Sequence, residues 1–128
     1  MKSLLTLITL VFTMMFSSTS FAEWTKVGEN VSGSAFYLDF ERIRKVDGYV
    51  YFWYMQNYLK PDKFGDFSAK MYLQGDCKIF RVKYLSFSYH KEPMGGGTGE
   101  VNASQSKEWT FPTPDSVIEE ILKKSCSR

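Results

Sequence analysis

Apolar and polar side chains alternate along most of the chain after residue 22, and a period of two is typical of β-strands. In residues 34–40, for example, Phe36 and Leu38 share one face while Tyr37 lies on the other. Turn pairs such as Asp47-Gly48 separate such segments and favour antiparallel hairpins. The pattern predicts a mostly antiparallel sheet built from residues 24–27, 34–40, 43–46, 49–59, 68–74, 78–89 and 109–111.

The longest predicted strand, 78–89, changes phase along its length. Its apolar positions are even-numbered up to Tyr84 and odd-numbered from Leu85 onward. A β-bulge near these two residues would keep both apolar sets on one face of the sheet. Burial of both faces of the strand is the alternative, and the sequence leaves the two open.

Residues 117–126 are the one segment with a clear helical period. Ile118, Leu122 and Cys126 recur every four residues and share one face of a helix. An amphipathic helix of this kind predicts an α+β fold in which one C-terminal helix covers one face of the sheet. The helix start has two candidate caps: Ser116 in a capping box with Glu119, or Thr113 with Pro114 at the first helical position.

The loop predicted at 92–106 is rich in glycine but does not match a phosphate-binding loop. It lacks a following Gly-Lys-Ser or Gly-Lys-Thr sequence and does not open a helix. Its composition predicts a flexible connection.

The first 22 residues have the features of a secretory signal peptide. Lys2 is followed by an apolar stretch from Leu4 to Phe16, which is too short to cross a bilayer, and small residues at Ser20 and Ala22 suit a cleavage site. The predicted organisation is a signal peptide at 1–22 and one domain at 23–128. We therefore expect export to the periplasm or beyond, with the cell surface also accessible.

Length and charge set the class of protein. Residues 23–128 form a chain of 106 residues, enough for one domain, with 15 basic and 14 acidic side chains once Lys2 is removed. A net charge of +1 and an exported location argue against nucleic-acid partners. No later apolar run reaches the length of a membrane span, and no cysteine lies directly after the cleavage site, so neither a transmembrane segment nor a lipid anchor is expected.

Cys77 and Cys126 are the two cysteines of the chain, and an even pair in an exported protein predicts a disulfide. A metal centre would need more ligands than these two thiols and the single histidine, His90, provide. The bond would join the end of the predicted helix to the strand or turn that carries Cys77.

The chain shows no catalytic pattern. His90 could pair with Ser86 or Ser88, oriented by Asp39 or Asp76, but no nucleophile-elbow sequence surrounds either serine. We therefore expect no enzymatic activity, no cofactor and no catalytic residues, with His90 at an exposed strand end.

Aromatic residues are concentrated in segment 49–59, whose two faces are almost equally apolar. A single helix can cover only one face of a sheet, so the other face is expected to bear exposed aromatic side chains, which usually mark an interface. Cross-strand packing of these rings within one chain is the alternative. The candidate protein-binding or dimer face consists of Tyr37, Tyr51, Trp53 and Tyr72.

A basic patch is predicted along the 78–89 strand. Lys78, Arg81 and Lys83 lie close together, and Arg81 and Lys83 share one face. Such a patch could dock an acidic or sulfated partner, or it could simply be a solvated strand face.

Several short motifs together resemble the bacterial surface-adhesin protein E family. The resemblance implies an antiparallel sheet of about six strands, a C-terminal helix tied to it by a disulfide, and dimerisation. For the member that named the family it also implies binding of host matrix proteins such as vitronectin and laminin. A periplasmic or secreted envelope-associated domain with a small-ligand or structural role is the alternative. The motifs are Trp24, Tyr37-Leu38-Asp39, Trp53, Gly75-Asp76-Cys77, Arg81, Pro93-Met94-Gly95, Trp109 and Pro114-Asp115-Ser116 through Cys126.

Overall fold

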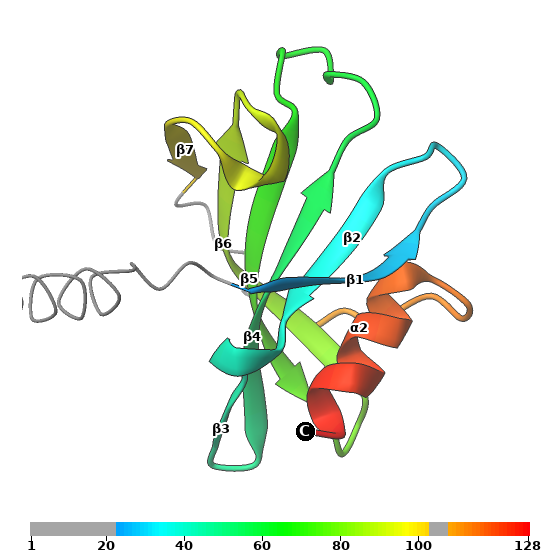
Figure 1. Cartoon of the computed structure of the whole chain (residues 1–128). Coiled ribbons are helices and arrows are strands. Elements are labelled where there is room, and N and C mark those ends of the chain that lie inside the picture. The colour runs from blue at the N-terminus through cyan, green and yellow to red at the C-terminus, as the bar shows by residue number, and fades with distance from the viewer. Residues whose placement is uncertain (1–22, 103–107) are drawn as a thin grey trace, which may run out of the picture.

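The computed structural model describes residues 23–102 and 108–128, which form one antiparallel sheet and one α-helix (Figure 1). The predicted signal peptide lies outside the described residues. The elements are β1 (Trp24–Glu29), β2 (Ala35–Asp39), the 3-10 turn η1 (Phe40–Arg42), β3 (Arg44–Val46), β4 (Tyr49–Asn57), β5 (Ser68–Asp76), β6 (Arg81–His90), the 3-10 turn η2 (Pro93–Gly95), β7 (Gly99–Asn102) and α2 (Val117–Cys126).

Six strands follow one another across the sheet in the order β1-β2-β4-β5-β6-β7, and β3 pairs with β4 beyond the end of β2. Every pairing is antiparallel. The fold class expected from the sequence is therefore confirmed. None of the helices in the described ranges is long and apolar enough to cross a membrane.

Three of the predicted segments differ from the structure. The strand predicted at 78–89 begins at Arg81, because residues 77–80 form a turn. The strand predicted at 109–111 is reduced to a single bridge between Thr110 and Val82. The loop predicted at 92–106 contains η2 and the short edge strand β7, which pairs with the end of β6.

The predicted bulge in β6 is present. Tyr72 of β5 lies opposite Ser86, whereas Leu73 lies opposite Tyr84, so Leu85 has no partner in the register. The extra residue reverses the alternation and keeps Tyr84 and Phe87 on the same face, where their rings stack at 5.3 Å between centroids.

The core lies between the sheet and α2. Ile121 and Leu122 of the helix are fully buried against a cluster that includes Phe52 and Leu73. Gly75 of β5 makes this contact possible, because a Cβ atom at this position would lie 2.7 Å from Cδ1 of Leu122. Leu122 therefore packs over β5 at a position where the strand has no side chain.

Ser116 is the cap of α2, as one of the two alternatives predicted. Its Oγ accepts a hydrogen bond from the backbone N–H of Glu119 at 3.2 Å. The Glu119 carboxylate accepts from the backbone N–H of Asp115, one residue before the position that a capping box would use.

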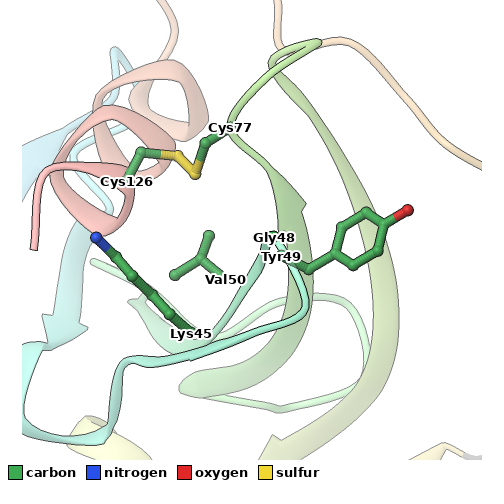
Figure 2. Close-up of a pocket in the computed structure, with 6 residues that line it drawn as sticks. All are labelled: Lys45, Gly48, Tyr49, Val50, Cys77 and Cys126. Carbon is green, nitrogen blue, oxygen red and sulfur yellow. A yellow bond between two sulfur atoms is a disulfide. The ribbon is translucent and has the colours of Figure 1, made fainter.

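The Cys77–Cys126 disulfide joins the turn after β5 to the last turn of α2 (Figure 2). The two cysteines are 49 residues apart in the sequence and their Cα atoms are 5.7 Å apart. The predicted disulfide between the sheet and the helix is confirmed.

We expect removal of this disulfide to weaken the fold strongly, because the closed loop no longer restricts the unfolded chain. Replacing both cysteines, Cys77→Ser with Cys126→Ser, should lower the free energy of unfolding by about 4 kcal/mol. Urea unfolding followed by tryptophan fluorescence measures this difference. The same double variant should be insensitive to reductant, and an unchanged urea midpoint would contradict the expectation.

A second expectation concerns the close helix–sheet contact at Gly75. The Cβ of Gly75→Ala would meet Leu122 at 2.7 Å and Val50 at 2.8 Å, so overpacking should cost about 1–3 kcal/mol. Gly28→Ala is the matched control, because its Cβ would lie 3.4 Å from Val117, an ordinary contact. Equal unfolding free energies for the two variants would disprove the role assigned to Gly75.

Candidate protein-binding face

The sheet face opposite α2 carries a group of half-buried aromatic side chains. Alternation along β4 directs Val50 and Phe52 into the core, and it directs Tyr49, Tyr51 and Trp53 to the other side. Figure 2 shows the ring of Tyr49 and the side chain of Val50 on opposite sides of the strand. We use the name aromatic face for Tyr49, Tyr51, Trp53, Tyr72 and Trp109.

The rings of the aromatic face contact one another across the strands. Tyr72 of β5 lies opposite Trp53 in the register, with 4.8 Å between ring centroids, and 6.3 Å from Tyr51. Trp109 stacks on Tyr49 at 5.7 Å. Cross-strand packing within the chain therefore accounts for part of the burial, while each of the five rings keeps part of its surface in solvent.

Two predicted basic residues lie on this same side. The Arg81 guanidinium lies 4.4 Å and the Lys83 ammonium 4.6 Å from the centre of the Trp109 ring. Cations over an indole ring are attracted to its π-electrons. Arg81 and Lys83 of the predicted basic patch thus lie beside the aromatic face, through their contacts with Trp109.

Lys78 lies in a turn and not on the strand. It was predicted to lie on the strand, but β6 begins at Arg81, and the backbone N–H of Lys78 donates to the Asp76 carboxylate in the turn before it. The predicted strand position of Lys78 is therefore wrong, and its place in the basic patch stays a prediction.

Arg44 supplies a cation that the sequence analysis missed. It lies on β3 opposite Tyr51, and its Nη2 donates a hydrogen bond to the Tyr72 hydroxyl at 3.2 Å. The hairpin turn at Asp47-Gly48 fixes this register, so counting back from the turn places Arg44 on the face of Tyr51.

Tyr37 lies on the same side of the sheet but apart from the aromatic face. It is opposite Met55, and no ring contact between Tyr37 and the aromatic face occurs among the described residues. Met55 is fully buried because η2 covers it: a Cβ on Gly95 would lie 3.3 Å from the Met55 sulfur. The Pro93–Gly95 turn therefore covers the part of the sheet next to Tyr37.

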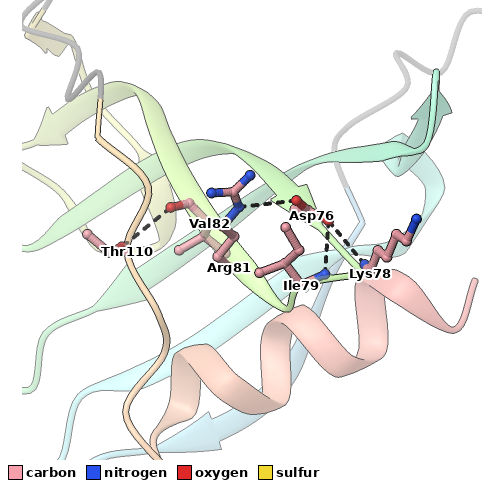
Figure 3. Close-up of polar contacts among 6 residues, drawn as sticks. All are labelled: Asp76, Lys78, Ile79, Arg81, Val82 and Thr110. Carbon is pink, nitrogen blue, oxygen red and sulfur yellow. Dashed lines mark hydrogen bonds and ion pairs between the residues drawn. The ribbon is translucent and has the colours of Figure 1, made fainter.

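Asp76 fixes the turn before β6 and the side chain of Arg81. Its Oδ1 accepts hydrogen bonds from the backbone N–H groups of Lys78 and Ile79, and its Oδ2 accepts from Arg81 Nε at 3.1 Å (Figure 3). These contacts lower the pKa of Asp76, first through the N–H of Ile79 and then through Arg81 and Lys78. One carboxylate thus closes the turn and holds Arg81 in position.

The position of Trp109 depends on the next residue. Thr110 exchanges two backbone hydrogen bonds with Val82, at 2.8 and 2.9 Å, and these attach the segment to the edge of β6 (Figure 3). The sequence signal for this single bridge is weak, because no alternating run surrounds it.

A hollow of about 320 Å³ opens beside Trp53 and Tyr72. Its walls also include Glu41, Arg42 and Arg44. Behind it, the Asp39 carboxylate is buried with Oδ2 3.4 Å from Arg42 Nε, and neither oxygen receives a hydrogen bond within the described residues. Asp39 therefore holds the Arg42 side chain near the hollow by charge alone.

A second hollow, of about 220 Å³, lies beside the disulfide on the helix side of β4 (Figure 2). It is lined by Lys45, Gly48, Tyr49, Val50, Cys77 and Cys126. The Lys45 amine and the disulfide are the functional side-chain groups that stand out in this lining. They provide too few polar contacts to orient a substrate.

His90 is buried, which corrects the exposed position expected from the sequence. Its Nε2 lies 2.8 Å from Ser88 Oγ, but Nδ1 has no partner within the described residues, so no carboxylate orients the ring as a catalytic triad requires. Nor do the described residues contain a group of three metal-ligating side chains. The aromatic face and the cations Arg44, Arg81 and Lys83 beside it are suited to binding.

Comparison with known proteins gives one family. The family model described as Surface-adhesin protein E matches residues 24–127. Among curated protein sequences none matches significantly.

Solved structures of Haemophilus influenzae protein E are similar in fold. Crystal form II of that protein has a TM-score of 0.64 and 19% identity, over 85% of this chain and 91% of that one. The protein E structure from non-typeable Haemophilus influenzae has a TM-score of 0.55 and 18% identity, over 86% and 76%.

The contacts of Asp76 predict a pH-dependent contribution to stability. Because its pKa is lower in the folded state than in the unfolded chain, its ionised form stabilises the fold above the usual carboxyl pKa of about 4, and this effect is lost as pH falls through the lowered value. Asp76→Asn should therefore be less stable than the parent protein at neutral pH, and the gap should close in acid.

Urea unfolding between about pH 7 and pH 3 measures this gap. Asp47→Asn, at an exposed turn, controls for loss of a carboxylate. A gap between Asp76→Asn and the parent protein that is the same at every pH would contradict the assignment.

Proposed function

Because the chain belongs to the surface-adhesin protein E family, we propose that it is an exported, non-enzymatic module that binds a protein partner through the aromatic face. The observation that carries the proposal is the grouping of half-exposed Tyr and Trp rings with arginine on the one side of the sheet that α2 leaves uncovered. Tyr, Trp and Arg are the residues most enriched at the energetic centres of protein interfaces.

The geometry of the rings supports a binding role. Trp53 and Tyr72 are held by each other and by Arg44, so they lose little side-chain freedom when a partner covers them. The hollow beside them offers a place for a partner side chain. A rigid aromatic pair next to a hollow is the arrangement expected of an anchor point.

The proposed partner is a host matrix protein, as the family resemblance implies for its named member. An envelope-associated role in the periplasm is the second candidate, favoured because Glu23, and not a cysteine, lies directly after the predicted cleavage site. Exposure to antibody or added protease on intact cells separates the two, since a periplasmic domain is shielded until the outer membrane is opened.

A second copy of the chain is a further proposed occupant of the aromatic face. A stable dimer needs about 800 Å² buried on each partner. Light scattering across a range of concentrations tests this proposal directly, because a dimer doubles the scattering mass.

Tyr72→Glu should weaken partner binding strongly, because it places a carboxylate at the centre of the aromatic face and removes the ring that contacts Trp53 and Tyr51. We expect a loss of about 2 kcal/mol, or near 30-fold in Kd. Binding of the purified domain to immobilised matrix proteins and its scattering mass are the two measurements.

Phe64→Glu is the matched control, because Phe64 is an exposed aromatic residue in the β4–β5 connection. It should bind as the parent protein does. Equal binding by Tyr72→Glu, with the fold intact by circular dichroism, would refute the aromatic face as the binding surface.

A further inference from the structure

Charge is distributed unevenly over the molecule. The strand register places five cations and three carboxylates on the sheet side opposite α2, a net charge of +2, while η1 beside it contributes one charge of each sign. Residues 23–128 as a whole carry +1, so the remainder of the domain carries −1. The charged residues of this side are Lys26, Arg44, Lys70, Arg81 and Lys83, with Glu29, Asp39 and Asp76.

The three carboxylates of this side are already engaged. Glu29 forms an ion pair with Lys26 on the same strand. Asp76 is buried and accepts hydrogen bonds from two backbone N–H groups and from Arg81. Asp39 is buried behind Arg42. A partner approaching the surface therefore meets mainly positive charge.

Two of the accessible cations, Arg44 and Lys83, are held by neutral groups. Arg44 is exposed, and its guanidinium donates to the Tyr72 hydroxyl, which carries no charge. The Lys83 ammonium lies over the Trp109 ring. Both side chains are thus positioned by contacts that leave their positive charge available to a ligand.

From this arrangement we propose that the aromatic face binds an acidic protein segment, whose carboxylates pair with Arg44 and Lys83. The proposal rests on the proposed function and specifies the chemistry of its partner. A glutamate or aspartate of the partner can enter the hollow beside Arg44, with its carboxylate on the guanidinium and its methylene groups against Trp53. Trp53 and Tyr72 then supply the apolar contact that a purely electrostatic patch lacks.

Charge favours such a partner over a second copy of the chain. Two aromatic faces brought together would set a net +2 against +2, and like charges across an interface are unfavourable. The two cases respond oppositely to salt, since screening weakens an acidic complex and relieves repulsion between two copies.

The test uses the purified domain of residues 23–128 and a random copolymer of glutamate and tyrosine as the acidic probe, followed by tryptophan fluorescence. The double variant Arg44→Gln with Lys83→Gln should lose at least about tenfold in affinity at low salt. Lys63→Gln removes an exposed lysine away from this surface, beside Phe64, and should stay within about twofold of the parent protein. Raising NaCl from about 50 to about 300 mM should weaken the parent complex more than that of the double variant.

Three results would overturn the proposal: equal affinity of the double variant and the parent protein, preference for a lysine–tyrosine copolymer, or binding of heparin without binding of the glutamate copolymer. The last would indicate a sulfated polysaccharide. Self-association that strengthens with salt and excludes the probe would likewise overturn it in favour of a second copy.

Trp53→Ala separates this proposal from the function on which it rests. If Trp53→Ala loses matrix-protein binding while the double variant keeps it, the aromatic face remains the binding surface and the acidic partner is wrong. If Trp53→Ala binds matrix proteins as the parent does, the proposed function itself fails.

Discussion

The burial of one helix against one face of a sheet is the constraint on which the rest of this structure depends. α2 inserts Leu122 where Gly75 leaves room, and this contact builds the core on that side. The described part of the chain has no second α-helix to cover the other side. Apolar side chains on that side must shield one another from water, and rings such as Trp53 and Tyr72 do so by contact across the strands. The uncovered sheet face is thus the common reason for the contacts between these rings and for the proposed binding of a partner there.

Most of the fold follows from local patterns, because alternation along a strand records which side chains face the core. The helix follows from its own period and the disulfide from the pair of cysteines, whereas the Ser116 cap and the bulge at Leu85 were each one of two alternatives that the sequence left open. β7 was not, because Gly99–Asn102 has little strand propensity of its own and is a strand through its pairing with β6.

The candidate site was predictable in part, for the same physical reason. Tyr51, Trp53 and Tyr72 follow from strand phase, and Arg44 would follow from the hairpin register. Trp109 lies outside any regular strand, so its place depends on contacts between segments distant in sequence. Lys78 was misplaced because Asp76 closes a turn by accepting hydrogen bonds from the backbone, which hydrophobic patterning does not reveal.

The bulge at Leu85 lets β6 change its length by one residue, which the regular pairing between β4 and β5 does not allow. Because Leu85 pairs with no residue of β5, its deletion would leave Tyr84 and Phe87 on the side they already occupy and would restore regular pairing. Loss of one residue at a regularly paired position would instead turn every following side chain to the wrong side. During divergence of the family, a gap of one residue should therefore be tolerated at this point of β6 and selected against in the middle of β4 or β5.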